Sequence, residues 1–273
     1  MGASSAKSTV GVIVSDIGNP FYIDVVRGLS DRLEEEGRLL LIGDCLNDEA
    51  RQAALARDLV QRGVAGLVVT VPHAKEVFAL DVPVVAVDRP PLQNAFVSAD
   101  NLLGGRIAAE HLARCGYSDI GILYAEDNLA PVADRIAGFR DGLERRSVKV
   151  RPELAVRCGG LDYDSAYEGA QQLLDAGADG IFAISDVMAT AVLAVATENG
   201  RGVPDQVGIV GYDDTPIASW PTVNLTSVAQ GTYSLGEEAA RLLLKQIASP
   251  LMKQQPTILS PRLVIRGSTR PAA

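Results

Sequence analysis

The sequence is poor in the residues on which metal, redox and membrane chemistry depend. Only three of its 273 residues are cysteine and two are histidine, and His73 and His111 show no metal-ligand spacing. Because no Cys-x-x-Cys pair occurs, we expect free thiols at Cys45, Cys115 and Cys158 in a reducing compartment. No apolar stretch approaches the roughly 20 residues that a membrane-spanning helix needs. We therefore predict no cofactor, no metal site and no membrane partner.

The common nucleotide-binding and catalytic motifs are missing as well. No Gly-x-Gly-x-x-Gly follows a strand, and no loop ends in Gly-Lys-Ser/Thr. The Gly-x-Ser-x-Gly elbow of hydrolases is absent, and neither histidine stands in an acid–base pattern. Asp88 ends a predicted strand as a phospho-acceptor would, but no acidic cluster accompanies it to hold a metal ion. These absences favour a binding protein over an enzyme.

Positive charge is also in short supply. The chain holds 25 Lys and Arg against 34 Asp and Glu, a formal net charge of −9. Non-specific DNA binding depends on basic side chains that displace counterions, so we expect any contact with DNA to come from a segment outside this sequence. Residues 1–8 are small and polar, with no hydrophobic segment. We expect them to be a disordered leader rather than a secretory signal, and the protein to be cytoplasmic.

Apolar strands alternate with amphipathic helices along nearly the whole chain. Strands are predicted at 9–15, 39–43, 66–70, 82–87, 120–124, 154–157, 180–184, 207–212, 257–259 and 263–265. Helices are predicted from Asn19-Pro20 to Gly37 and at about 49–62, 73–80, 102–115, 131–146, 162–176, 186–199 and 233–248. Such alternation is typical of parallel sheets covered by helices on both faces.

The number of strands predicts two lobes rather than one large sheet. Roughly ten strands with a restart at Asn101 favour an α/β protein with two doubly wound parallel-sheet lobes. We predict an N-terminal lobe of 9–101 plus 230–260 and a C-terminal lobe of 102–229 plus 261–273. The chain would cross between them three times, first near 99–103 and again near 227–231.

Polar side chains follow several of the predicted strands. These residues are Asp16, Asp88, Arg89, Ser185, Asp186 and Asp213. Because open α/β sheets bind ligands at the carboxyl ends of their strands, we expect the six side chains to converge in a cleft between the lobes. The strand 207–212 runs directly into Asp213 and Asp214, and Trp220 follows with a flat face for stacking.

A series of short motifs marks the chain from end to end. They are Asp-Ile-Gly-Asn-Pro-Phe-Tyr at 16–22, Val-Pro-Val-Val-Ala-Val-Asp-Arg at 82–89, Asp100-Asn101 with Gly104-Gly105 and His111-Leu112, Arg-Ile-Ala-Gly-Phe at 135–139, Phe-Ala-Ile-Ser-Asp-Val-Met-Ala at 182–189, Gly-Tyr-Asp-Asp at 211–214, and Leu-Val-Ile-Arg-Gly-Ser-Thr at 263–269. In this order and spacing, the chain resembles the effector-binding core of the LacI/GalR family of bacterial transcription regulators over about 9–269.

The resemblance implies a periplasmic binding protein-like type I fold and a function. The chain would be the ligand-sensing core of a transcription regulator, expected to be a repressor. It would bind a sugar or sugar derivative in the cleft, and a purine is a less favoured ligand. It would form a homodimer and control operator binding through a helix-turn-helix domain that this sequence does not contain. Periplasmic sugar-binding proteins for transport or chemotaxis share the fold and are the alternative. Gly231 stands where the family usually has proline, which predicts a looser crossing.

The resemblance also assigns effector-binding residues. They are Asp16, Phe21, Tyr22, Asp88, Arg89, Arg135, Phe182, Ser185, Asp213, Trp220 and Gln230.

Each assignment has a structural alternative. Arg135 could be a solvated arginine at the end of a helix, and Asp213 could be a loop carboxylate that caps a neighbouring helix. Asp88 and Arg89 could pair with each other. One of Phe21 and Tyr22 is expected in the core, and Trp220 is equally suited to packing. Asp186 is predicted mainly to cap the following helix, Asn19 to cap the first helix, and Asp214 to brace its loop.

Overall fold

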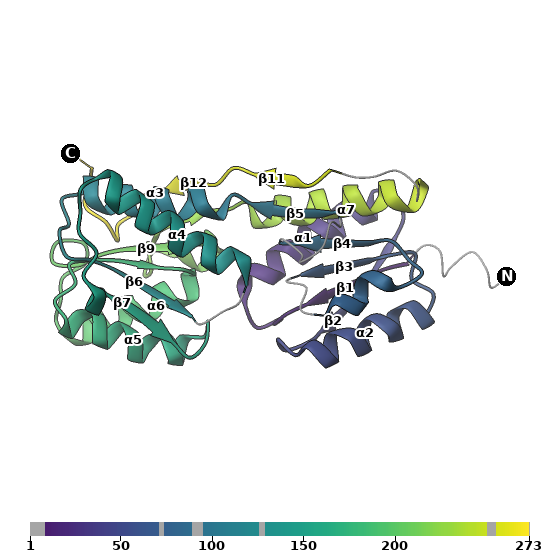
Figure 1. The fold of residues 1–273 in the computed structure, drawn as a ribbon, viewed down its shortest axis with the longest axis horizontal. Coiled ribbons are helices and arrows are strands. Elements are labelled where there is room, and N and C mark those ends of the chain that lie inside the picture. The colour runs from purple at the N-terminus through teal and green to yellow at the C-terminus, as the bar shows by residue number, and fades with distance from the viewer. Residues whose placement is uncertain (1–8, 71–73, 89–94, 126–128, 250–254, 273) are drawn as a thin grey trace. The chain divides into compact units, whose positions relative to one another are not determined.

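Two compact units make up the structure, a computed structural model that describes residues 9–70, 74–88, 95–125, 129–249 and 255–272 (Figure 1). The N-terminal unit comprises the described residues up to Ala99 and those from Gly231 to Leu259; the C-terminal unit comprises 100–230 and the chain from Ser260 onward. The chain passes between the units three times. Residues 100, 101, 230 and 260 lie in the C-terminal unit, whereas the sequence placed them in the other lobe.

The N-terminal unit is built on a six-stranded sheet in the order β11-β5-β4-β3-β1-β2, with every neighbouring pair parallel. Its strands are β1 (Thr9–Val14), β2 (Leu39–Asp44), β3 (Leu67–Thr70), β4 (Val84–Val87), β5 (Phe96–Ala99) and β11 (Thr257–Leu259). Helices α1 (Pro20–Glu34) and α7 (Thr232–Ala248) cover one face; α2 (Glu49–Gln61) and the short 3-10 helix η2 (Lys75–Ala79) cover the other. Covered on both faces, β1, β3 and β4 can be almost wholly apolar.

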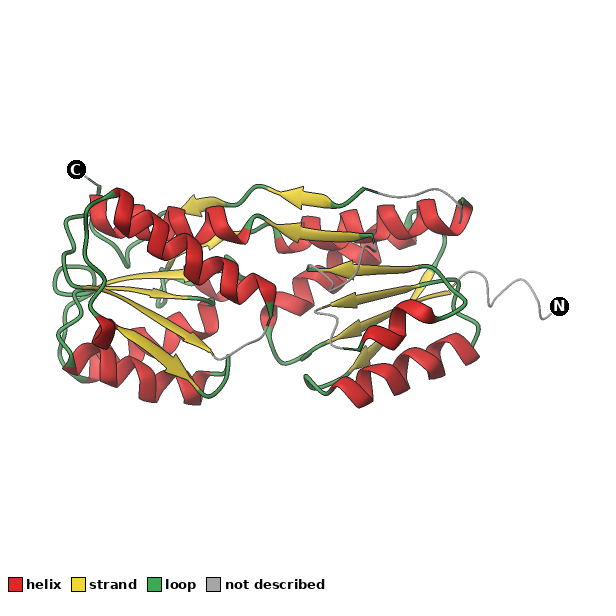
Figure 2. Ribbon diagram, viewed as in Figure 1, coloured by secondary structure: helices red, strands yellow, loops and turns green. Residues whose placement is uncertain are grey.

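The C-terminal unit repeats this plan in the order β12-β10-β9-β8-β6-β7. Its strands are β6 (Ile120–Ala125), β7 (Ala155–Cys158), β8 (Gly180–Ala183), β9 (Gly208–Tyr212), β10 (Thr226–Ala229) and β12 (Arg262–Val264). Only the β10–β12 pairing is antiparallel. Helices α3 (Asn101–Arg114) and α4 (Ala130–Arg145) pack on one face, and α5 (Tyr163–Asp175) and α6 (Asp186–Glu198) on the other (Figure 2). The 3-10 helices η3 (Pro152–Leu154) and η4 (Pro216–Ser219) lie in its loops.

The predicted fold class, two doubly wound α/β sheets, is therefore confirmed. Two strands fall outside the prediction. β5 has only four residues, and β10 is an internal strand where the sequence pattern predicted a crossing. Both contain serine, and β10 also threonine, so neither shows the continuous apolar run that marks the other buried strands.

A side-chain cap begins α1 where the sequence predicted one. Asn19 accepts a hydrogen bond from the Phe21 backbone N–H at 3.0 Å, and Pro20 occupies the first helical position of α1. Asp100 caps α3 in the same way through the Leu103 N–H at 2.9 Å. The chain therefore turns into α3 immediately after the first crossing, which fixes the start of the C-terminal unit.

Helices α3 and α4 touch through a reciprocal pair of glycines. A Cβ atom added to Gly105 would lie 2.0 Å from the backbone oxygen of Arg135, and one added to Gly138 would lie 1.9 Å from a backbone oxygen of α3. Gly28 and Gly236 join α1 and α7 in the same manner. The contact at Gly105 is made by the backbone of Arg135, so the close approach of the helices sets the position of that arginine.

Candidate functional site

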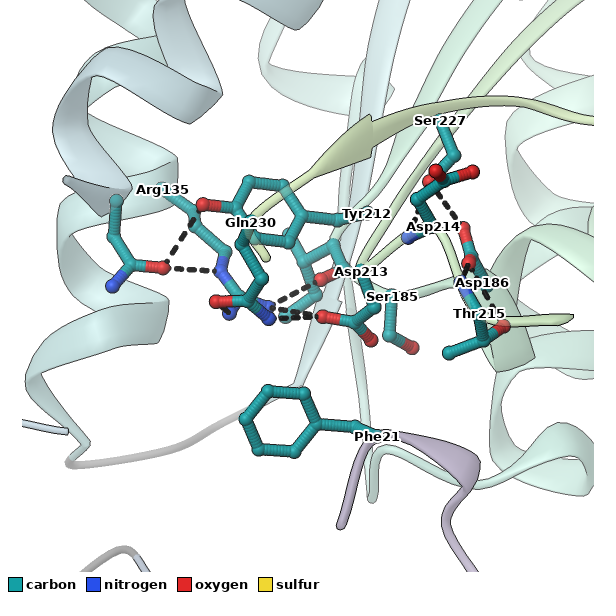
Figure 3. A network of polar contacts seen from close by, with 12 residues as sticks. Phe21, Arg135, Ser185, Asp186, Tyr212, Asp213, Asp214, Thr215, Ser227 and Gln230 are labelled. Atoms are coloured by element: carbon teal, nitrogen blue, oxygen red, sulfur yellow. Dashed lines mark hydrogen bonds and ion pairs between the residues drawn. The ribbon is translucent and has the colours of Figure 1, made fainter. Parts of the chain in front are cut away.

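Arg135 lies on α4, is only 8% exposed, and is held on three sides (Figure 3). Its Nε donates to Oδ1 of Asn101 at 2.8 Å, and its Nη1 donates to the backbone oxygen of Ile184 at 2.8 Å. The guanidinium carbon lies 3.7 Å from the ring centroid of Tyr212, a cation–π contact. These contacts fix the plane of the guanidinium group.

The remaining edge of the guanidinium group faces Asp213 and Gln230, which are almost completely buried (Figure 3). Nη1 of Arg135 lies 3.8 Å from Oδ1 of Asp213, and Nη2 lies 3.5 Å from Oε1 of Gln230. Gln230 also donates through Nε2 to Oδ1 of Asp213 at 2.5 Å. The contacts on this edge of Arg135 are thus longer than those on the other edge. We call Asn101, Arg135, Tyr212, Asp213 and Gln230 the arginine cluster.

Part of this cluster lies at the ends of adjacent strands. Ser185, Asp213 and Gln230 follow β8, β9 and β10, which are parallel neighbours and end at the same edge of the sheet. Asp213 has a backbone φ of 106° and its N–H donates to the Val228 oxygen at 2.9 Å. Non-glycine residues rarely adopt positive φ, and such strained positions concentrate at functional sites.

Asn101 was not assigned to the site from the sequence, yet it organises the cluster. Its Oδ1 accepts from Arg135 and also from the hydroxyl of Tyr212, at 3.1 Å. Asn101 is 3% exposed and Tyr212 is fully buried. The Asp100-Asn101 motif indicated only where a helix begins. Nothing in the local sequence shows that Asn101 contacts a side chain 34 positions away.

Asp186 belongs to a second buried network at the same end of the sheet (Figure 3). Its Oδ2 accepts from the backbone N–H and the hydroxyl of Thr215 at 2.7 and 2.9 Å, and its Oδ1 accepts from the Ser227 hydroxyl at 2.6 Å. Burial raises the pKa of Asp186 to about 6, although these hydrogen bonds oppose the shift. The prediction that Asp186 caps α6 is wrong. Ser185 is the cap, accepting from the Met188 N–H at 3.3 Å.

Asp214 turns away from the arginine cluster toward Arg266. An Nη2–Oδ1 ion pair of 2.7 Å joins them, and Arg266 also donates to the Leu225 oxygen at 2.8 Å. The Asp214 N–H donates to the Ser227 hydroxyl at 3.1 Å. These contacts are those of a residue that braces the loop after β9.

Residues 109–269 match the periplasmic binding protein-like domain family. The ribose operon repressor of Halalkalibacterium halodurans is 30% identical over 267 residues, which cover 96% of this chain and 79% of that repressor. The chain belongs to the LacI/GalR family of transcriptional regulators.

Two solved structures agree with this assignment. The transcriptional regulator CelR in complex with cellobiose is 30% identical, with a TM-score of 0.87 over 96% of this chain and 84% of that chain. A LacI family regulator from Enterococcus faecium with bound ribose is 27% identical, with a TM-score of 0.88 over 97% of this chain and all of the other. The chain is the ligand-sensing core of a LacI-type regulator, and the transport alternative is not favoured.

Within this LacI/GalR core, two aromatic residues assigned to the effector occupy different environments. Phe182 is fully buried, and its ring stacks on Phe139 with centroids 5.4 Å apart and packs against Tyr212 at 6.4 Å. It has no exposed surface and supports Tyr212 from within the core, and its assignment to the effector stays a prediction. Trp220 follows η4 and is 54% exposed.

In the N-terminal unit of the regulator core, the two predicted acidic residues differ in setting. Asp16 is half-buried, and its Oδ1 accepts from the Gly18 N–H at 2.8 Å. Asp88 is buried with φ at 70° and accepts from the Ser98 hydroxyl at 3.3 Å. Arg89 lies outside the described residues, so its pairing with Asp88 stays a prediction.

Phe21 and Tyr22 pack edge to face with ring centroids 4.9 Å apart, and both are more than nine-tenths buried. In the same unit, Ser15 follows β1 and Thr70 ends the neighbouring strand β3. The Ser15 hydroxyl donates to the Thr70 backbone oxygen at 3.2 Å. Neither residue was assigned to the site from the sequence. The assignment of Phe21 and Tyr22 to the effector stays a prediction.

Within the described ranges, no group of three or more His, Cys, Asp or Glu side chains is placed to hold a metal ion. None of the helices described there is long and apolar enough to span a bilayer.

Proposed function

We propose that this core senses a sugar or sugar derivative through the arginine cluster of its C-terminal unit. The observation that carries the proposal is the 3.8 Å separation between Nη1 of Arg135 and Oδ1 of Asp213. That distance exceeds a hydrogen bond, but a hydroxyl oxygen can lie about 2.8 Å from both atoms. A hydroxyl accepts from the guanidinium group and donates to the carboxylate, so one hydroxyl satisfies both partners.

The similar regulators support this choice of ligand. Their structures contain ribose in one case and cellobiose in the other, both of which present several hydroxyl groups. A purine is the second candidate, since a ring N–H can donate to Asp213, but a ring nitrogen cannot both donate and accept as a hydroxyl does.

A panel of sugars tests the proposal. The melting temperature and the fluorescence of Trp220 are followed while pentoses, hexoses, disaccharides and purines are titrated. At least one sugar should raise the melting temperature, because a ligand that binds the folded state stabilises it. A response to a purine with none to any sugar rejects the proposal.

Substitution of the arginine locates the response. Arg135→Lys keeps the positive charge but loses the planar fork that reaches Asn101 and the Ile184 oxygen together. It should abolish the sugar response. Arg62→Lys makes the same change at an exposed arginine that pairs with Asp58; it is the matched control and should respond like the wild type. Retention of the full response by Arg135→Lys would place the effector elsewhere.

The regulator is proposed to act in the cytoplasm as a homodimer, with operator contacts made by a helix-turn-helix domain outside this sequence. The N-terminal unit offers a surface for a second copy along β2, the edge strand of its sheet. Leu39 is 70% exposed, and Leu41, Ile42 and Leu46 are also exposed. An unpaired apolar edge of this kind is uncommon in a monomer unless something covers it.

Sedimentation equilibrium tests the dimer. Leu39→Lys should produce monomers, whereas Ile258→Lys, which places the same charge on the edge strand β11, should leave the dimer intact. A wild-type protein that remains monomeric at all concentrations refutes this part of the proposal.

A further inference from the structure

The loop between β9 and β10 is held in an uncommon backbone shape. It spans residues 213–225, with Asp213 at its start and Trp220 in its second half. Three of its residues have positive φ angles: Asp213 at 106°, Asp214 at 55° and Asn224 at 44°. Residues with a side chain seldom adopt such angles, and they persist only where surrounding contacts hold them.

The side chain of Arg266, in the segment that follows β12, contacts both ends of this loop. Its Nη2 forms a 2.7 Å ion pair with Oδ1 of Asp214, near the start of the loop. Its Nη1 donates to the backbone oxygen of Leu225, the last residue of the loop, at 2.8 Å. One planar guanidinium group therefore joins the two ends, which the single charged nitrogen of lysine is less suited to do. The next residue, Gly267, also lies against the loop, because a Cβ atom added there would be 2.3 Å from Nδ2 of Asn224.

The segment 266–268 is itself anchored to the sheet of the C-terminal unit. The Arg266 N–H donates to the Thr226 hydroxyl of β10 at 2.9 Å. Ser268 is buried, and its hydroxyl accepts from the Thr226 N–H at 2.8 Å and donates to the Ile209 oxygen of β9 at 2.6 Å. These contacts fix the backbone of Arg266 relative to the two strands that the loop connects.

Asp213 depends on this arrangement through the backbone. Its N–H donates to the Val228 oxygen of β10 at 2.9 Å, and the next residue, Asp214, is paired with Arg266. A change of the backbone angles at Asp214 would turn the Asp213 carboxylate away from its position 3.8 Å from Arg135. The contacts of Arg266 oppose such a change.

We infer that Arg266 is a positioning residue, which bridges the two ends of the loop 213–225 and thereby sets the position of Asp213. It acts through Asp214 and the Leu225 oxygen. The consequence for effector binding rests on the proposed function, whereas the bridging of the loop does not depend on any ligand.

Amide hydrogen exchange tests the bridge without a ligand. In Arg266→Gln, peptides that cover 213–225 should exchange about tenfold faster or more than in the wild type, because local opening of the loop is no longer opposed at both ends. Peptides that cover β6 and β7 should exchange at the wild-type rate, which separates a local effect from a general loss of stability. Wild-type exchange over 213–225 in the folded variant overturns the inference.

Effector binding tests the consequence for Asp213. The affinities of ribose and cellobiose are measured by calorimetry, and a sugar that binds the wild type should bind Arg266→Gln about tenfold more weakly or worse, because small displacements of binding groups are costly. Equal affinity in the variant overturns the positioning role while sugar sensing stands. If neither sugar binds the wild type, the proposed function fails for these sugars, and hydrogen exchange alone decides whether Arg266 holds the loop.

Arg151→Gln is the matched control, because Arg151 also joins a carboxylate to a backbone oxygen. Its Nη1 pairs with Asp119 at 2.7 Å, and its Nη2 donates to the Ala176 oxygen at 3.2 Å. Asp119 precedes β6, at the end of the sheet opposite to the start of the loop. This variant should therefore leave both the exchange over 213–225 and the sugar affinity unchanged.

A second variant covers a failure to fold. If Arg266→Gln shows no cooperative melting curve, Arg266→Lys is measured in its place. Lysine keeps a positive charge beside Asp214 but lacks the planar fork that reaches the Leu225 oxygen at the same time. Faster exchange over 213–225 is again expected, and wild-type exchange in Arg266→Lys would overturn the bridge.

Discussion

The Nε of Arg135 and the Oδ1 of Asn101 form a 2.8 Å hydrogen bond between α4 and the first residue of α3. The same oxygen accepts from the Tyr212 hydroxyl, so one amide holds both the guanidinium group and the ring beneath it. Gln230, at the end of β10, reaches the other side of Arg135. Asn101 and Gln230 adjoin two of the three passages of the chain between the units.

Asn101→Ala should weaken effector binding about tenfold or more, because Arg135 loses a partner that fixes its plane. It also removes the acceptor that the Tyr212 hydroxyl and the Arg135 Nε share, a loss of about 1–3 kcal/mol in unfolding free energy. Calorimetry and urea unfolding measure the two effects. Asn199→Ala, an exposed asparagine at the end of α6, is the control. Wild-type affinity in Asn101→Ala would show that Asn101 does not position Arg135.

Gly138→Ala should destabilise the C-terminal unit by about 3 kcal/mol, since overpacking of this kind forces the backbones apart. The added Cβ would lie 1.9 Å from the Leu102 oxygen, a distance that only separation of α3 from α4 relieves. Gly159→Ala is the control, because its Cβ would meet nothing closer than 3.9 Å. Denaturant unfolding of both variants checks the prediction, and equal midpoints would disprove it.

Much of this architecture was predictable because strand ends are local features. An apolar run that stops at a carboxylate shows where a ligand edge lies, and Asp213 was expected at that edge for this reason. Arg135 and Gln230 were assigned through the family resemblance, and the structure joins all three. The packing of Phe182 was not predictable, because alternation along β8 does not reveal which face packs on Phe139.

Long-range hydrogen bonds were the part that could not be predicted. Asp186 looked like a helix cap because it precedes a helical run, and its partners Thr215 and Ser227 are 29 and 41 positions away. The role of Asn101 was hidden for the same reason. A buried polar group must find a partner, but the sequence does not say which one.

Asp186→Asn should change how stability depends on pH. The folded state binds a proton on Asp186 more tightly than the unfolded chain does, since its pKa rises from 3.8 to about 6. Wild-type stability therefore falls relative to the variant as pH rises from about 4 to about 6, by an amount on the order of 3 kcal/mol, and the difference is constant above that range. Asparagine can still accept from Thr215 and donate to Ser227.

Urea unfolding at half-unit pH intervals measures this difference. Asp164→Asn, which removes one exposed carboxylate from the first turn of α5, is the control. A wild-type-minus-variant difference that grows as pH rises would contradict the raised pKa of Asp186.

His111 should have the opposite effect on how the unfolding free energy depends on pH. Its Nε2 lies 2.9 Å from the Thr269 hydroxyl, and burial, aided by the charge of Arg114, lowers the pKa of its ring from 6.5 to about 4. As the pH falls, His111 is therefore protonated in the unfolded chain before it is protonated in the folded state. The contribution of His111 is fully present above about 6.5 and is lost between about 6.5 and 4, on the order of 2 kcal/mol.

His111→Gln keeps an amide that can bond Thr269 but cannot titrate, so it should remove this acid-side loss. The wild-type-minus-variant difference in unfolding free energy should decline as the pH is lowered from 6.5 to 4, the reverse of the trend for Asp186→Asn. Because the two windows overlap, the slopes partly cancel in the wild type and are resolved only by measuring both variants. Parallel stability curves for wild type and His111→Gln would show that the ring has the same pKa in the folded and unfolded states, which would contradict the lowered pKa of His111.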